Sequence, residues 1–341
     1  NATVAGAFAQ IQGSRRKVDY FAGINFKSTR YQREGLYKNG TYFDNSYGKG
    51  EQQSFSDVSA KAGLTYKLTG RHLFNVNGAF ISNIPTIRTT FSNSRVNNNI
   101  TPDLTSEKII TGDVSYIFRL PKFQSRLTTY YTKFSDAIET SFFFAEGLLG
   151  DQADFVNEII TGVDKLNIGT ELSLEYQVTG TIKLLGSGSF GQYTYNNNPH
   201  LYIQSESLIN EDSDFGTAYL KDYRVSGTPQ RAYSLAFEYR DPAYWWFQVN
   251  GSFLTNNYLD ISPLLRTDNF YLDADGVPFL DDETELEITQ KEVDDLLVQE
   301  KFDDAFLLDV VGGKSWRIDN KYVGFFAGIN NVLGELYKTG G

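Results

Sequence analysis

Residues 57–68 read Asp57-Val-Ser-Ala-Lys-Ala-Gly-Leu-Thr-Tyr-Lys-Leu68, and the side chains alternate strictly between two kinds. Every even position is apolar or aromatic, whereas the odd positions carry only Asp, Ser, Lys, Gly and Thr. Successive side chains of a β-strand point to opposite faces of the sheet, while a helix would need apolar positions three and four residues apart. The stretch therefore predicts a strand with one apolar face and one polar face.

The same two-residue period recurs along the whole chain, most clearly in residues 18–26, 110–118, 165–178 and 233–239. From such segments we expect about 12 strands, near residues 3–11, 17–29, 55–68, 72–82, 107–119, 124–139, 161–178, 181–195, 219–239, 244–258, 305–318 and 321–333. Their connections alternate in length. Short ones fall near 13–16, 69–71, 120–123, 179–181, 240–243 and 319–321, and long ones near 30–54, 83–106, 141–160, 196–218 and 259–304.

Short turns at one rim and long loops at the other are typical of transmembrane β-barrels, in which the short turns face the periplasm. Aromatic residues gather beside the short turns, where amphipathic rings would meet the membrane interface. The sequence predicts an all-β fold, namely a transmembrane antiparallel β-barrel of an outer membrane. A soluble β-sandwich or barrel is the alternative, but its strands usually have about five or six residues, with short loops at both ends.

Composition excludes several kinds of site. The 341 residues include no cysteine, so neither a disulfide nor a thiolate metal site can form, and His72 and His200 are far apart. We therefore expect no metal site, no cofactor and no catalytic residue, and we do not expect an enzyme. The net charge of −11 is concentrated in residues 260–304, which carry 15 acidic and 3 basic residues. The chain has no basic stripe of the kind that nucleic acid requires.

Four features in order resemble the barrel of TonB-dependent outer-membrane receptors, particularly the Bacteroidetes type that includes SusC-like proteins. They are Phe8-Ala-Gln10 followed by Ala22-Gly-Ile-Asn-Phe26; Ile84-Pro-Thr-Ile-Arg88 followed by Asn99-Ile-Thr-Pro-Asp-Leu-Thr-Ser-Glu107; Asn167-Ile-Gly-Thr-Glu171; and Gly328-Ile-Asn-Asn-Val-Leu333 with Tyr337.

The resemblance implies that residues 1–341 are the C-terminal part of a 22-stranded barrel in the Gram-negative outer membrane, a multi-pass protein in contact with lipid. The plug domain and the last strand would lie outside this sequence. Physical chemistry agrees, because the edges of an open 12-stranded sheet cannot be exposed to hydrocarbon. We therefore expect the missing strands to come from residues outside the chain.

The function implied is import of a scarce nutrient such as a siderophore, glycan or peptide. Energy would come from the inner membrane through TonB-ExbB-ExbD and the absent plug region, and a SusD-like lipoprotein could serve as a lid. The alternative is a receptor-like barrel with a structural or assembly role in a larger outer-membrane complex.

Substrate-binding candidates fall into two groups. Tyr37, Tyr42 and Tyr47 lie in the long connection at 30–54, where rings could stack on a ligand or form the loop's own core. Six polar positions on the predicted water-facing side of the strands could line a substrate path, although each alone suits a solvated wall: Asn25, Lys61, Asn75, Asn77, Gln248 and Asn250.

Three local patterns have a plain interpretation beside a functional one. Glu171 and Glu175 share a strand face, which favours a hydrated lumen wall over acid–base chemistry. Asp273-Ala-Asp-Gly276 favours an Asp-Gly turn over a calcium loop, since the remaining ligands are missing. Thr289 with Glu292 predicts a capping box that opens a short helix with Val293, Leu296 and Leu297 on one side.

Overall fold

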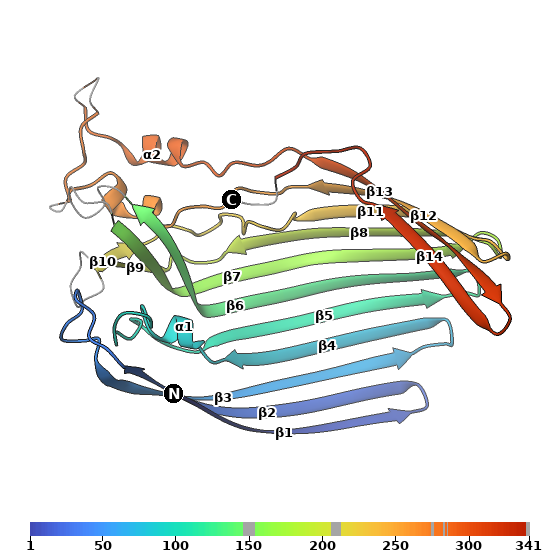
Figure 1. The fold of residues 1–341 in the computed structure, drawn as a ribbon, viewed down its shortest axis with the longest axis horizontal. Helices are drawn as coiled ribbons and strands as arrows, with labels where there is room; N and C mark the ends of the chain where they lie inside the picture. Colours follow the sequence, from blue (N-terminus) through green and yellow to red (C-terminus); the bar gives the residue numbers. More distant parts are fainter. Residues whose placement is uncertain (146–153, 206–212, 274–275, 282–283, 285, 339–341) are drawn as a thin grey trace.

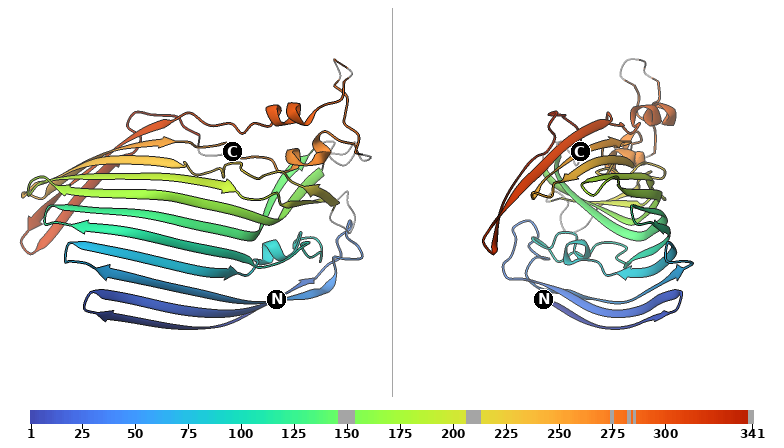
Figure 2. Two further views of the ribbon diagram at one scale, coloured as in Figure 1. Left: turned by 180° about the vertical axis from the view of Figure 1, so that it is seen from behind. Right: turned by 90° about the vertical axis from the view of Figure 1, so that its right-hand side faces the viewer.

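Long antiparallel strands form one curved sheet that makes up most of the molecule (Figures 1 and 2). The computed structural model describes residues 1–145, 154–205, 213–273, 276–281, 284 and 286–338. Within these described residues the 14 strands are β1 (Ala2–Arg15), β2 (Val18–Gly35), β3 (Gly48–Lys67), β4 (His72–Asn83), β5 (Glu107–Arg119), β6 (Phe123–Ala145), β7 (Asp154–Gln177), β8 (Ile182–Tyr195), β9 (His200–Ser205), β10 (Ser213–Thr217), β11 (Arg231–Arg240), β12 (Trp245–Thr255), β13 (Ala305–Ile318) and β14 (Lys321–Ile329).

Twelve of these strands follow one another across the sheet in the order β1 to β8, then β11 to β14. This agrees with the predicted number, and all six predicted short turns join neighbouring strands at one end. We call that end, at the right of Figure 1, the short-turn end. The opposite end, which carries β9, β10 and the helices α1 (Ile87–Thr90) and α2 (Gln290–Leu296), is the long-loop end.

Several predicted boundaries were wrong. The connection expected at 141–160 is mostly strand, since β6 runs to Ala145 and β7 begins at Asp154. The connection expected at 196–218 contains the short strands β9 and β10, which pair with each other, and β9 also pairs with β7. The strand expected at 219–239 begins only at Arg231. Gly227 and Pro229 interrupt the pattern, and Asp222 has a φ of +72°, a left-handed conformation that ends extended backbone.

The predicted apolar face of the sheet is exposed. Leu64 and Leu172 keep 44% and 41% of their surface accessible, and Phe26, Val76 and Ile110 are exposed in the same way. A soluble sandwich would bury these side chains in its interior. An apolar sheet face of this extent is the surface that a membrane barrel offers to lipid.

The sheet is open in the part of the chain that the structure describes. Strand β1 pairs only with β2, and β14 pairs only with β13. The expectation that further strands close a barrel therefore stays a prediction.

Helices are few and short. Besides α1 and α2, the described residues form two 3-10 turns, Leu264–Arg266 and Asp268–Phe270. Among the described residues, no helix has both the length and the apolar character needed to cross a membrane. The predicted capping box of α2 is confirmed, since Glu292 accepts a hydrogen bond from the Thr289 N–H at 2.7 Å. Its apolar side is only partly covered, because Val293 is buried whereas Leu296 is 71% exposed.

The buried hydrophobic core lies at the long-loop end rather than under the main sheet. Strands β6 and β7 have 23 and 24 residues, whereas about ten suffice to span a bilayer. Their distal halves bend away where the register shifts between Phe134 and Glu139, close to Gly162, whose φ is +70°. The bent hairpin packs against β9, β10 and nearby loops around Val156, Ile160, Val163, Leu201, Ile203, Ala218 and Leu220.

Candidate functional site

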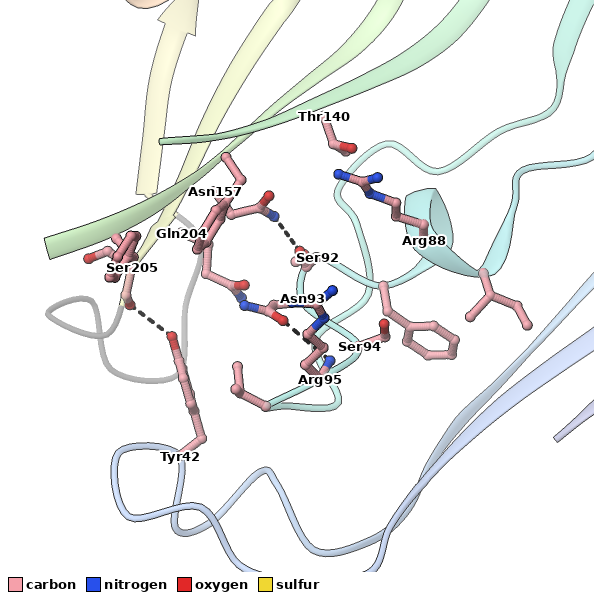
Figure 3. A pocket seen from close by; sticks show the side chains of 15 residues that line it. Tyr42, Arg88, Ser92, Asn93, Ser94, Arg95, Thr140, Asn157, Gln204 and Ser205 are labelled. Atoms are coloured by element: carbon pink, nitrogen blue, oxygen red, sulfur yellow. Dashed lines mark hydrogen bonds between the residues drawn. The ribbon is translucent and has the colours of Figure 1, made fainter. Parts of the chain in front are cut away.

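A cavity of about 670 Å³ lies at the long-loop end, between the segment 87–96, the distal hairpin of β6 and β7, and the end of β9 (Figure 3). We call it the loop cavity. Small-molecule sites usually have volumes of about 300–1,000 Å³, so the space suits a compact ligand.

The distal hairpin separates the loop cavity from the hydrophobic core because its side chains alternate. Phe143, Val156 and Ile160 lie on one face and pack in the core or against it. Phe142 and Asn157, which are paired across the hairpin, point to the other face and line the cavity. One face of this strand pair thus packs in the hydrophobic core, and the opposite face lines the loop cavity.

The segment 84–106 forms the opposite wall and is fixed at several points. Thr86 and Thr89 cap α1 reciprocally, with N···O distances of 3.2 and 2.9 Å. The Asn157 amide donates a hydrogen bond to the Ser92 carbonyl, and the Tyr202 hydroxyl donates to Asp103 at 2.9 Å. Satisfied backbone groups make this wall well defined.

Arg33 of β2 holds the same segment, 84–106, through hydrogen bonds from its guanidinium. Its guanidinium donates to the Ser94 carbonyl at 2.8 Å, the Ser46 carbonyl at 3.0 Å and the Asn98 side chain at 2.6 Å. Burial lowers the pKa of Arg33 from its ordinary value, yet an arginine stays charged at any physiological pH. One side chain of β2 therefore ties together two loops, 36–47 and 84–106.

Positive charge and aromatic surface meet in the loop cavity. Arg88 and Arg95 are among its lining residues, and none of the described lining residues is acidic. In Figure 3 the Arg88 side chain extends from α1 toward the side where Thr140 of β6 lies. The Phe142 and Phe155 rings are parallel, with centroids 5.4 Å apart and an interplanar angle of 2°.

The three predicted tyrosines have different positions. Tyr42 is only 1% exposed and its hydroxyl donates to the Ser205 carbonyl at 2.8 Å, so it fixes its loop against β9 and borders the cavity. Tyr37 and Tyr47 are 84% and 62% exposed, and neither is among the described residues that line the cavity. The structure brings only one of the three to the site.

The six predicted wall residues lie on the polar face of the main sheet, away from the loop cavity. Asn75 donates to Thr65 at 2.8 Å, and Asn77 donates to both Asp113 oxygens at 3.1 Å. Asn250 accepts from Ser234 at 2.6 Å. Asn25, Lys61 and Gln248 occupy the same face of β2, β3 and β12. We call these six residues the polar wall; three of them are hydrogen-bonded, and their role in a substrate path stays a prediction.

The other patterns fit their plain interpretations where the structure describes them. Glu175 pairs with Lys183 at 3.1 Å on the polar face. Gly276, with a φ of +77°, donates to the Asp273 carbonyl at 3.0 Å, as in an Asp-Gly turn. Ala274 and Asp275, the middle of that pattern, lie outside the described residues.

Arg88, Arg95 and the phenylalanine pair were not predicted as site residues. Arg88 stands in the motif Ile84–Arg88, which was interpreted only as a family resemblance. Arg95 lies in a long connection without periodicity, and its place depends on Arg33, 62 positions away in the sequence. No local sequence signal could have joined these residues.

Comparison with known proteins gives a consistent result. The protein-family model described as "TonB dependent receptor-like, beta-barrel" matches residues 2–332. Among solved structures, the chain is similar to the copper transporter OprC, with 16% identity and a TM-score of 0.61 over 98% of this chain and 42% of that one. No curated protein matches the chain.

Two other solved structures are similar to the same extent. The ferric-catecholate import receptor Fiu from E. coli K12 has 13% identity and a TM-score of 0.58 over 99% of this chain and 41% of that one. The siderophore receptor PiuA from Acinetobacter baumannii has 12% identity and a TM-score of 0.63 over 99% of this chain and 40% of that one. The chain thus spans about two fifths of the length of these relatives, and the likeness shows a common fold.

Proposed function

The chain belongs to the TonB-dependent receptor-like β-barrel family, and from this premise we propose that the complete protein imports a scarce nutrient across the outer membrane. Receptors of this family are outer-membrane proteins that work with TonB-ExbB-ExbD. The family match over residues 2–332 carries the proposal. The exposed apolar sheet face supports it, as does the polar wall on the other face.

In this proposal the long-loop end faces the outside of the cell, because long loops of such barrels are extracellular. A ligand would meet the loop cavity first and the polar wall second. The remaining strands of a 22-stranded barrel, and a plug that TonB pulls, would come from the rest of the protein. The larger size of the similar solved structures supports this division.

The SusC-like type is a finer proposal. It rests on the ordered motifs, among which Ile84–Arg88 overlaps the start of the segment that lines the loop cavity and Asn99–Glu107 follows its end. A SusD-like lipoprotein lid would then cover the long-loop end. Leu286, Leu296 and Val298 are 68%, 71% and 71% exposed there and offer apolar surface for such a partner.

Uptake measurements in cells test the importer. Depletion of medium components would be followed by mass spectrometry in the parent strain, in a strain lacking the receptor and in one lacking TonB. We expect at least one component whose uptake is lost in both deletion strains. Uptake that needs the receptor but continues without TonB would contradict the proposal. A scaffold would instead co-purify with partners in fixed ratio, and its removal would leave all uptake unchanged.

A further inference from the structure

We propose that the apolar face of the sheet carries a binding site for an anionic lipid of the outer leaflet, whose phosphate is held by Arg224 and Arg231. The inference goes beyond transport, because it concerns how the barrel is seated in the membrane rather than what it imports. It requires only that this face touches lipid and that the long-loop end faces outward.

Arg231 lies at the depth where a spanning strand reaches the outer headgroups. It is the first of the 10 residues of β11, and roughly 9–11 residues of a tilted strand cross a bilayer. Tyr233 and Leu235 follow it at two-residue intervals on the apolar face, and its partner on β8 is Phe190, which is 52% exposed. An arginine on this face at this depth places its guanidinium among lipid headgroups.

A second arginine borders the same small cavity, which has a volume of about 360 Å³. Arg224 forms an isolated β-bridge with Thr194, which alternation along β8 places on the same face as Phe190. The Gln299 side chain accepts a hydrogen bond from the Arg224 N–H and donates one to the Arg224 carbonyl, both at 2.8 Å. Arg224 and Arg231 therefore meet at the cavity from the same side of the sheet, and the backbone of Arg224 is held in place.

Neither guanidinium is neutralised within the described part of the chain. Neither takes part there in an ion pair or a hydrogen bond, and the Arg231 Nε is buried without a partner. The Arg231 guanidinium carbon lies 4.0 Å from the centroid of the Phe190 ring, a contact that orients it and leaves its N–H donors free. By contrast, Lys133 on the same face of β6 is paired with Asp164 at 3.3 Å. Two guanidinium groups with free donors suit the oxygens of a phosphate.

The apolar surroundings favour a lipid over a free anion. Ile168 and Phe190, which are 44% and 52% exposed, line the cavity itself. Two residues nearer the short-turn end on their strands, Leu172, Tyr233 and Phe253 continue the same face and are 41%, 39% and 39% exposed. Acyl chains would cover this surface while their own headgroup meets the arginines, whereas a free phosphate would gain nothing from it.

The test uses the complete receptor in a neutral detergent and follows lipid binding by native mass spectrometry. The probe is dimyristoyl phosphatidylglycerol, whose phosphate gives it a net negative charge. Dimyristoyl phosphatidylcholine is the zwitterionic match with the same chains, and glycerol phosphate is the anion without chains. We expect the anionic lipid to bind about tenfold or more tightly than either, because one match lacks the net charge and the other lacks the apolar contact.

Two results of this comparison would overturn the proposal. Equal binding of the two lipids would show that the charge of the headgroup is not recognised. Displacement of the anionic lipid by an equal concentration of glycerol phosphate would show a site for free anions instead of a lipid site.

Variants locate the site. The double substitution Arg224→Gln and Arg231→Gln should weaken binding of the anionic lipid about tenfold, to the level of the zwitterionic lipid, and Arg231→Gln alone should remove part of the preference. The matched control for the single variant is Arg30→Gln. Arg30 shares the apolar face of β2 with Phe26 and lies toward the long-loop end, but it is not among the described residues that line the cavity. Its substitution should leave binding unchanged.

A charge-preserving variant separates recognition from folding. Arg224→Lys with Arg231→Lys should keep part of the affinity, and thermal melting of the β-structure followed by circular dichroism should be the same in all variants. If the glutamine double variant melts as the parent does and still prefers the anionic lipid, the site is wrong. The assay involves no transport, so receptor-dependent uptake that continues without TonB would contradict the importer and leave this site standing.

Discussion

Tyr42 shows how the role of one side chain depends on what covers it. A tyrosine in a loop rich in aromatic residues looks from the sequence like a stacking surface, and Tyr37 and Tyr47 are indeed exposed. Tyr42 is buried instead, and its hydroxyl reaches a backbone carbonyl 163 residues away. The sequence alone cannot distinguish these tyrosines, because the strand β9 that covers Tyr42 is distant in the chain.

Tyr42→Phe removes the hydrogen bond to Ser205 and leaves the ring in place. We expect a local loss of about 1 kcal/mol, since the carbonyl loses a partner in a buried position. Hydrogen exchange should show faster opening of β9. Tyr37→Phe is the matched control, because Tyr37 is 84% exposed and should change nothing. Equal exchange in both variants would contradict the anchoring role of Tyr42.

Glu158 is the charged residue whose burial has the clearest consequence. It is 4% exposed and lies in the distal half of β7, beyond the part that a bilayer covers. Burial raises the pKa of its carboxyl, nearby Asp260 raises it further, and hydrogen bonds from Ser141 and the Leu264 backbone oppose the shift. A raised pKa means that the protonated form stabilises the fold, and this contribution is lost as the pH rises through the pKa of the folded state.

The distal hairpin should therefore open more readily at pH 8 than at pH 5. Hydrogen exchange of β7 and β9, expressed as protection relative to the free peptide, measures the effect. Glu158→Gln should keep high protection at both pH values, because an amide cannot ionise. If protection of the parent protein is the same at both pH values, the assignment of this response to Glu158 is wrong.

Among the elements, the long strands were predictable and the short ones were not. Alternation fixed β3 and β5 to within a few residues at the short-turn end, because one face of each strand must be apolar along its whole length. Strands β9 and β10 have only 6 and 5 residues, and they form by pairing with each other and with β7. Such pairing depends on tertiary contacts that no local pattern records.

Glycine 169 tests the packing of the strand pair β6–β7. A Cβ atom on Gly169 would lie 2.5 Å from the Tyr130 hydroxyl and 2.8 Å from the Phe190 carbonyl oxygen. Gly169→Ala should therefore cost about 1–3 kcal/mol of unfolding free energy, seen as a lower urea midpoint. In the matched change Gly78→Ala the nearest atom is 3.8 Å away, so the midpoint should not fall. Equal midpoints for the two variants would contradict the packing of Tyr130 over Gly169.

At the scale of the whole molecule, the sequence predicted the sheet better than the site. The fold follows from the alternation of apolar and polar side chains, which recurs in strand after strand. A wrong boundary for one strand therefore leaves the prediction of the other strands unchanged. The loop cavity depends on segments from β2, α1, β6, β7 and β9 that meet only in three dimensions. Its charged residues lie in long connections, where periodicity gives no information. The six polar wall residues lie on the sheet face where alternation places them, while their role in a substrate path stays a prediction.

The central claim is that alternate side chains of each strand touch lipid while their neighbours are hydrated. These 341 residues contain no cysteine. Once any cysteine in the rest of the receptor has been replaced, single cysteines can be placed at each position from Val58 to Tyr66 and spin-labelled in the complete receptor in lipid vesicles. Labels at Val58, Ala60, Ala62, Leu64 and Tyr66 should be accessible to oxygen and shielded from a water-soluble nickel chelate, and labels at Ser59, Lys61, Gly63 and Thr65 should show the reverse. Accessibility without a two-residue period, or with the two sets exchanged, would contradict the account.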